Sequence, residues 1–228
     1  MYTLRIDMPV SLGRMVVLAL LARLAREHPA LAIDARFSEA YVDLIKDGID
    51  VAIRTGHLRD SSLVARQIGS QELVLFAAPS YLERAGRPRT LSDLKGHTAV
   101  LFRVPSTGRE RPWNFRAGGR NVDFLPKSRV RVDHGDALVQ AAVQGMGLGQ
   151  VPHYMVAEEL GSGALVELLP ALRPAPMPIW AVMPSSRLMP QRVRAILDLI
   201  EATPGALPAA PSVRPDREIS RIHRSGRR

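Results

Sequence analysis

The chain has 228 residues, of which 46% are hydrophobic and 23% are charged, and its mean hydropathy is near zero. This balance excludes a disordered, highly charged protein, and it leaves room for one large core or two smaller ones. The absence of cysteine excludes disulfides, thiolate zinc sites and cysteine nucleophiles. The net charge is +9, but residues 206–228 carry +4 of it. The remainder is only mildly basic, which makes no strong case for a nucleic-acid groove.

The chain opens with a predicted strand, "LRID" at residues 4–7, and a predicted helix that begins at Ser11 and is closed by Pro29. The apolar run "MVVLALLA" at 15–22 lies inside this helix and is shorter than the roughly 20 residues that a membrane span needs. Charged residues continue the helical face beyond the run, which favours a mature helix over a signal peptide. We therefore predict a cytoplasmic protein with no membrane partner.

Strand-like and helix-like segments alternate along the rest of the chain, which predicts an α/β fold with mostly parallel sheets. A strand at 31–37, a short amphipathic helix at 39–48 and a strand at 49–56 complete a first compact set. A second set follows, and the Pro-rich segment 173–178 then leads to a last strand and helix. A return of these two elements to the first set would give two lobes joined by two crossings, with a cleft between them.

The predicted division of the chain follows from this pattern. Lobe I comprises residues 1–76 and 178–205, lobe II comprises 77–177, and a basic tail follows at 206–228. The tail is rich in proline and poor in large apolar residues, which predicts disorder. It is interpreted as a solvated appendage, with a basic arm that touches nucleic acid or membrane as the alternative.

The glycine run "GMGLG" at 145–149 invites comparison with a phosphate-binding loop. Such a loop follows a strand and opens a helix, whereas this run follows a predicted helix and precedes a predicted strand. Gly145 is therefore expected to end the helix in a left-handed conformation.

The motifs of several enzyme classes are missing. The sequence has no G-x-S-x-G elbow, no H-E-x-x-H pair, no Walker A loop and no kinase signature. Its six histidines are scattered, and no two of them lie three or four residues apart. We predict no catalytic residue, no metal and no cofactor.

The start of the first predicted helix and the end of the strand at 49–56 supply candidate ligand contacts. Ser11 with the N–H groups of Leu12 and Gly13 forms an anion-friendly helix start, and Thr55 and Gly56 lie where the strand ends. The alternatives are that Ser11 only caps its own helix and that Thr55 sits in a plain turn.

A second set of candidates lies in "VDHGDALV", which opens the helix before the glycine run. Asp133 or His134 is the predicted N-cap, and Gly135 follows as the helix begins. Arg103, at the end of a strand, could supply positive charge to a carboxylate, although such a residue is often simply an exposed strand end.

Five segments together resemble the effector-binding domain of LysR-type bacterial transcriptional regulators, and they occur in the family's order and spacing between Leu4 and Ala202. They are "LRIDMPVSLGRMVVLALLARLAREHPAL", "DLIKDGIDVAIRTGHLRDSSLVARQI", "APSYLERAGRPRTLSDLKGH", "GDALVQAAVQGMGLGQVPHYMVAEELGSGALVELLP" and "PIWAVMPSSRLMPQRVRAILDLI". The resemblance implies the two-lobed type II periplasmic-binding-protein fold, with a small-molecule inducer, often a carboxylate or an aromatic metabolite, in the interlobe cleft. It places Ser11 and Thr55 at the family's first-lobe contacts and Gly135 at the second-lobe helix start.

The resemblance also implies assembly into dimers or tetramers, and we expect the first helix, residues 15–25, to contribute to the interface. Family members bind DNA through an N-terminal winged helix-turn-helix, which this sequence does not contain, so DNA is expected as a partner only through such a module. The acid at Asp133, where the family often has a small polar residue, disfavours a strongly anionic effector unless Arg103 offsets it. A transport solute-binding protein or an enzyme on the same fold are the alternatives.

Overall fold

The computed structural model describes residues 2–39, 42–58, 63–185, 188–208 and 220–221. The chain divides into two compact units, one formed by residues 1–71 with 177–228 and the other by 72–176. The chain therefore passes from the first unit to the second and back again, which confirms the two predicted crossings.

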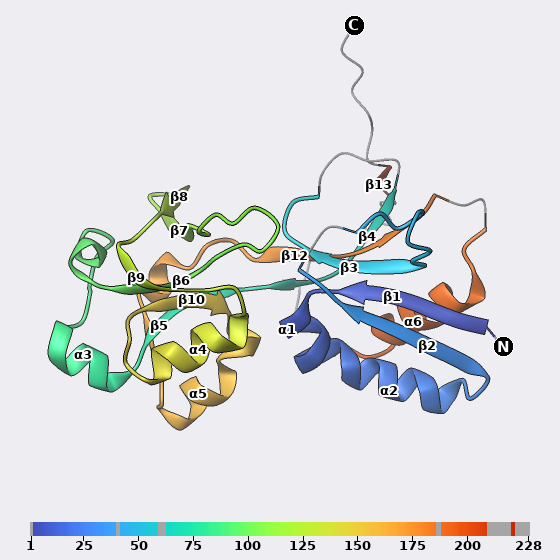
Figure 1. The fold of residues 1–228 in the computed structure, drawn as a ribbon, viewed down its shortest axis with the longest axis horizontal. Helices are drawn as coiled ribbons and strands as arrows, with labels where there is room; N and C mark the ends of the chain where they lie inside the picture. Colours follow the sequence, from blue (N-terminus) through green and yellow to red (C-terminus); the bar gives the residue numbers. More distant parts are fainter. Residues whose placement is uncertain (1, 40–41, 59–62, 186–187, 209–219, 222–228) are drawn as a thin grey trace, which may run out of the picture. The chain divides into compact units, whose positions relative to one another are not determined.

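The first unit is built on a six-stranded sheet with the strand order β13-β4-β12-β3-β1-β2 (Figure 1). Its strands are β1 (Tyr2–Met8), β2 (Leu31–Phe37), β3 (Val51–Thr55), β4 (Val64–Gln71), β12 (Met177–Met183) and β13 (Ser220–Arg221). Its helical segments are α1 (Val10–Leu12), the π-helical η1 (Gly13–Val17), α2 (Leu18–Glu27) and α6 (Gln191–Glu201). The first three follow one another without a gap, so they form the single predicted helix.

Side chains that point to one face of β1 pack under the helices that cover this side of the sheet. Leu4, Ile6 and Met8 are fully buried, and α2 and α6 pack against each other and against the sheet (Figure 1). The apolar face of α2 and the apolar face of α6 supply the other half of this layer, as the 3.6-residue period of their sequences predicts. The opposite side of the sheet holds a smaller cluster around Leu44 and Ile49.

Two expectations for the first unit are corrected. The sheet is mixed and not mostly parallel: β2 and β3 run parallel to β1, whereas β12 runs antiparallel to β3 and β4. The chain leaves the unit along β4 and returns along β12, which forces these neighbours into opposite directions.

The predicted helix at 39–48 is only a turn at residues 44–48. Asp43 Oδ1 accepts the N–H groups of Ile45 and Lys46, and these bonds compete with the backbone hydrogen bonds of a helix. Residues 40 and 41 of that prediction lie outside the described residues.

The second unit contains three small sheets. β5 (Leu73–Ala77) lies between β10 (Gly149–Pro152) and β11 (Val166–Leu168), and both partners are antiparallel to it. β6 (Ala99–Phe102) pairs in parallel with β9 (Ser128–Val132), and β7 (Trp113–Ala117) forms an antiparallel pair with β8 (Arg120–Phe124). The helical segments are α3 (Pro79–Ala85), η2 (Asp93–Gly96), α4 (Gly135–Val143), η3 (His153–Met155), α5 (Ala157–Ser162) and η4 (Pro170–Leu172).

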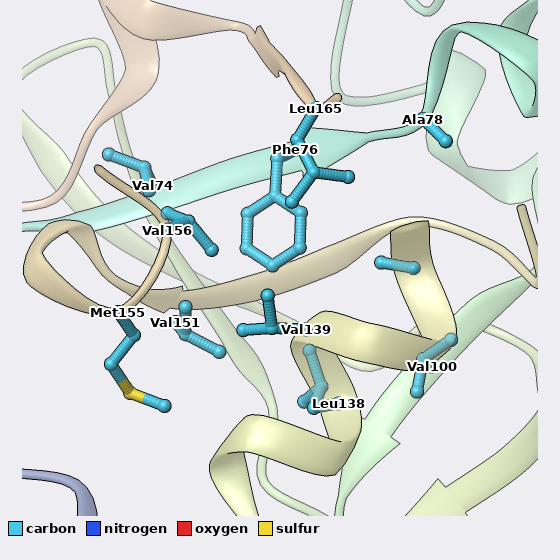
Figure 2. Packing of buried hydrophobic residues seen from close by; sticks show 11 residues of the cluster. Val74, Phe76, Ala78, Val100, Leu138, Val139, Val151, Met155, Val156 and Leu165 are labelled. Carbon is cyan, nitrogen blue, oxygen red and sulfur yellow. The ribbon is translucent and has the colours of Figure 1, made fainter. Parts of the chain in front are cut away.

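One of the two buried clusters of the second unit gathers around Phe76, whose ring lies between the strands and α4 (Figure 2). Leu138 and Val139 reach this ring from α4, and Val151 reaches it from β10.

The glycine run at 145–149 allows this close packing. A Cβ at Gly149 would lie 2.8 Å from Phe76 and Leu138, and one at Gly147 would lie 2.5 Å from the carbonyl oxygen of Thr98. Gly145 ends α4 with φ +69°, which confirms that the run is a helix stop and a strand entry.

In the part of the chain that the structure describes, no helix is long and apolar enough to cross a membrane. Of the predicted tail, residues 206–208 and 220–221 are described, and both pieces contact β4. Ser70 N–H donates to the Pro208 carbonyl at 3.2 Å, and Ser220 pairs with Ala65. Residues 209–219 and 222–228 lie outside the described residues.

Candidate functional site

In the first unit, the predicted ligand contacts lie at the carboxyl ends of two neighbouring parallel strands. β1 pairs with β3 through Ile6 with Val51 and Asp7 with Ala52. Ser11 follows β1 after a short connection, and Thr55 ends β3. The carboxyl edge of a parallel sheet is where loops and helix starts converge on ligands in α/β proteins. The structure thus brings Ser11 and Thr55 to the same edge of one sheet.

The helix start itself differs from the predicted one. The N-cap is Pro9 and not Ser11, and no side chain of the N-cap residue caps the helix. The carboxylate of Glu39 takes over this role, because its Oε1 accepts the Val10 N–H at 3.1 Å. Ser11 lies inside the first turn with 7% of its surface exposed, so its hydroxyl does not cap the helix as predicted. Sequence reasoning missed Glu39, whose only signal was an acid shortly after the strand at 31–37.

Leu12 and Gly13 contribute to the site mainly through packing. Leu12 is fully buried, and the Gly13 N–H donates to the Pro9 carbonyl at 2.8 Å. A Cβ at Gly13 would lie 2.5–2.8 Å from Met8 and Phe37, so glycine is needed for the helix to approach the end of β1. The backbone groups that this turn still offers a ligand are the N–H groups of Ser11 and Leu12, which the first turn of a helix leaves without an intrahelical partner.

Gly56 has both of its backbone hydrogen-bonding groups engaged. Its N–H donates to the Pro178 carbonyl at 2.9 Å, and its carbonyl accepts the Trp180 indole N–H at 2.8 Å. Gly56 also has φ +81°, a conformation that favours glycine. It therefore shapes the loop after β3, while the partly exposed Thr55 side chain is the group that can reach a ligand.

A buried ion pair lies under this edge of the sheet. Arg54 Nη2 is 2.6 Å from Asp7 Oδ1, with 13% of the arginine side chain and 1% of the aspartate side chain exposed. Burial raises the pKa of Asp7 above its usual 3.8, and the hydrogen bond and charge of Arg54 only partly oppose this. Arg36 adds to the opposing attraction, and Asp47 adds repulsion. Sequence reasoning missed the pair, although a charged residue inside each of two buried strands was the available signal.

In the second unit, four predicted residues meet at the carboxyl ends of β6 and β9. Arg103 and Asp133 directly follow these paired strands, and Arg103 Nη2 donates to Asp133 Oδ2 at 2.8 Å. Both side chains are about half exposed, at 49% and 55%. The hydrogen bond from Arg103 lowers the pKa of Asp133. The acid that disfavours an anionic effector is therefore already balanced by the base that was expected to offset it.

His134 is the N-cap of α4, and Gly135 is the first residue of that helix. The side chain of His134 does not cap this helix start, and its ring nitrogen Nδ1 lies 3.9 Å from Asp136 Oδ2. The first turn of α4 contains one acidic residue, Asp136, and the side chain of His134 is exposed. Together with Arg103 and Asp133, this end of the unit offers hydrogen-bond donors and acceptors of both signs.

No cluster of three or more histidine, aspartate or glutamate side chains suited to a metal ion occurs among the residues that the structure describes. What the two sets offer is recognition: hydroxyl groups, backbone N–H groups and one exposed ion pair. Groups of these kinds orient small polar molecules in binding sites.

Comparison with known proteins places this arrangement in a family. The model of the LysR substrate binding domain matches residues 2–204. The chain belongs to this family. It is 32% identical over 200 residues to the HTH-type transcriptional activator AaeR of Escherichia coli, covering 86% of this chain and 63% of that protein. It is 31% identical over 193 residues to an uncharacterized HTH-type transcriptional regulator of Haemophilus influenzae, covering 85% of this chain and 66% of the relative.

The solved structure of the CrgA regulatory domain, a LysR-type transcriptional regulator from Neisseria meningitidis, is similar over 88% of this chain and 98% of that one. The TM-score is 0.75 and the identity is 25%. The fold is thus the two-lobed, periplasmic-binding-protein-like fold of LysR regulatory domains. The chain spans 63–66% of the length of curated relatives such as these two, while it covers nearly all of a regulatory domain. As a LysR substrate-binding domain, it has the effector-binding role that the sequence predicted.

Proposed function

We propose that this LysR substrate-binding domain senses a small-molecule effector on behalf of a bacterial transcriptional regulator and carries out no chemistry on it. The observation that carries the proposal is the placement of Ser11 and Thr55 at one carboxyl edge, where Ser11 follows β1 and Thr55 ends the adjacent strand β3. Both residues supply hydroxyl groups, which can donate and accept hydrogen bonds. DNA binding then belongs to a helix-turn-helix module outside this sequence, and cytoplasmic location follows from the same role.

The charges at the two sets favour a particular orientation of a carboxylate effector. The start of α1 already faces the carboxylate of Glu39, which repels a second anion there. Arg103 is bound to Asp133 only through an exposed ion pair, and such pairs are weak. Arg103 can therefore exchange its partner for a ligand carboxylate at little cost. We expect the acidic group of an effector to bind at Arg103 rather than at the start of α1.

The test begins with a panel of aromatic acids, keto acids and neutral metabolites, screened by the shift in the thermal unfolding midpoint. The affinity of the best compound is then measured by calorimetry. Ser11→Ala and Thr55→Ala should each weaken binding about two- to tenfold, because each removes one hydrogen bond. Ser106→Ala, an exposed serine outside both sets, is the matched control. Unchanged affinity in both hydroxyl variants would remove these residues from the site.

A double-mutant cycle tests whether a single ligand contacts both sets, as the family resemblance implies. Ser11→Ala and Arg103→Gln are combined, and the coupling between the two losses of affinity is measured with the same compound. Loss of affinity in only one of the two variants would confine the ligand to one unit. Turnover of the panel compounds, followed by chromatography, would contradict the non-enzymatic role.

We also propose that the domain forms dimers through its first helix. Met15, Leu18, Ala22 and Ala25 are exposed and recur at spacings of three and four residues, which puts an apolar stripe on one face. Met15 and Leu18 are 45% and 47% exposed. Leu18→Glu should shift the protein toward monomer in sedimentation at micromolar concentration, whereas Leu125→Glu, an exposed leucine in the second unit, should not. A monomeric native protein would refute the proposal.

A further inference from the structure

A cavity in the first unit lies far from the residues proposed to bind the effector. Its volume is about 1000 Å³, and it is formed by the beginning of β1, the end of α2 with the turn into β2, and one face of α6 along its whole length. None of the candidate residues at the carboxyl edge lines it. Tyr2 lines the cavity and Met8 ends the same strand, so the two places are about 20 Å apart along β1.

The floor of this cavity is apolar. Leu31, Ala195 and Leu199 line it, and Leu199 is only 4% exposed. The side chain of Tyr2 also lines the cavity while 77% of the residue is exposed, the highest exposure of any large aromatic residue in the described part of the chain. Such a ring gains nothing from the core of the unit, but it would gain from stacking on a flat apolar molecule.

Two walls of the cavity are fixed by ion pairs. Arg23 Nε donates to Glu27 Oε1 at 2.6 Å, and its Nη1 donates to Thr203 Oγ1 at 2.9 Å. Arg192 forms a bidentate pair with Asp50, at 2.9 Å and 2.7 Å. These arginines are oriented before any ligand arrives, so a ligand that enters does not bear the entropy of ordering them. Their charges are balanced, however, and they do not select a charged ligand.

The charge selectivity comes from Arg194 and Asp198, one helical turn apart on α6. Both are exposed, both line the cavity, and neither forms an ion pair or side-chain hydrogen bond with another described residue. A free guanidinium beside an apolar floor is complementary to the acidic group of an amphipathic anion. The Asp198 carboxylate opposes such a ligand, which gives the two residues opposite and measurable effects.

We propose that this cavity is a second small-molecule site, for an amphipathic anion with a flat apolar body and one acidic group. The body lies against Leu199, Ala195 and the ring of Tyr2, and the acidic group pairs with Arg194. The site is independent of the effector contacts at the carboxyl edge and does not rest on them.

The test uses 8-anilinonaphthalene-1-sulfonate, which has this chemistry, together with N-phenyl-1-naphthylamine, which keeps the rings and lacks the sulfonate. Binding to the folded full chain is measured by calorimetry and fluorescence. Ala195→Trp fills the cavity and should reduce the affinity for both compounds at least about tenfold. Ala157→Trp, an equally large change on exposed α5, should leave both affinities unchanged.

The charge variants separate this site from unspecific adsorption. Arg194→Gln should weaken sulfonate binding about three- to tenfold and leave the neutral compound unaffected, while Asp198→Asn should tighten sulfonate binding about two- to threefold. Thr55→Ala should bind both compounds as the native chain does. Native-like binding in Ala195→Trp, or equal effects of Arg194→Gln on both compounds, would overturn the proposal. Circular dichroism of each variant establishes that it is folded.

Discussion

Each of the two units has an arginine–aspartate pair on neighbouring parallel strands or just after them, and the two pairs differ in burial. Arg54 and Asp7 lie within the strands of the first unit and are almost completely buried, whereas Arg103 and Asp133 lie just beyond the strand ends of the second unit and are half exposed. A buried pair cannot be broken without leaving an uncompensated charge, but an exposed pair exchanges readily with water or a ligand. The first pair therefore maintains the architecture under the site, and the second pair is available for recognition.

The largest expected effect comes from breaking the buried pair. Arg54→Met leaves the Asp7 carboxylate buried without its partner, and we expect the variant to lose about 3 kcal/mol or more of unfolding free energy at pH 7. The pKa of Asp7 is already raised above 3.8 by burial, and loss of Arg54 raises it further. Between the unfolded value of 3.8 and this raised pKa, the folded variant holds a proton that the unfolded chain has released.

The stability of Arg54→Met should therefore recover as the pH falls through the raised pKa of Asp7 toward the unfolded value of 3.8. Chemical denaturation at several pH values measures the trend. The double variant Arg54→Met/Asp7→Asn is the control, since it has no carboxylate to protonate and should not show the recovery. A native-like stability of Arg54→Met at pH 7 would mean that the pair does not support the first unit.

A polar pair of the second unit should show the opposite pH dependence. The Thr98 N–H donates to the Tyr81 hydroxyl oxygen at 2.9 Å, and the hydroxyl lies 3.2 Å from His97 Nδ1. Burial lowers the pKa of His97, against the attraction of Asp93. The neutral histidine is therefore favoured by folding, and its contribution to stability should be lost as the pH falls below its unfolded value of 6.5.

Hydrogen exchange of amides in β6, followed between pH 7 and 5, measures this loss in the second unit. In His97→Gln, which cannot become charged, protection should change less with pH. Tyr81→Phe should cost about 1 kcal/mol at pH 7 because it removes the hydroxyl group. If β6 is protected equally in the native chain and His97→Gln at every pH, the histidine does not titrate with folding.

The smallest effect on stability is expected for the exposed pair. Arg103→Gln should leave the unfolding midpoint nearly unchanged, because both partners of the ion pair are exposed to water. The same variant should weaken binding of a carboxylate effector more than binding of its amide analogue. A strong destabilisation by Arg103→Gln would erase the contrast between the two pairs.

Much of the fold was predictable because local patterns and tertiary structure agree. The helix from Ser11 to Pro29 was predicted within a residue or two, and the glycine run was correctly assigned as a helix stop because left-handed glycines recur there. The helix at 39–48 was wrong, since its amphipathic spacing did not reveal that the Asp43 side chain binds two backbone N–H groups.

The sequence located the candidate residues, but it did not show which of their polar atoms remain available to a ligand. Ser11 was expected to cap its helix, but Glu39, 28 residues later, reaches back to the helix start. Gly56 was predicted as a ligand contact, but Pro178 and Trp180 of β12 occupy both of its backbone polar groups. Neither partner could be read from local spacing, because each comes from a distant part of the chain.

By itself, the sequence determined the order of the elements, the absence of cysteine chemistry and the family, since hydrophobic period and turn residues act over a few neighbours. Tertiary structure alone decided which charges are paired, which donors are free and where a cavity remains. Those properties depend on burial and on contacts between residues far apart in the chain. The same two residue types thus form a structural pair at Arg54 and an exchangeable one at Arg103.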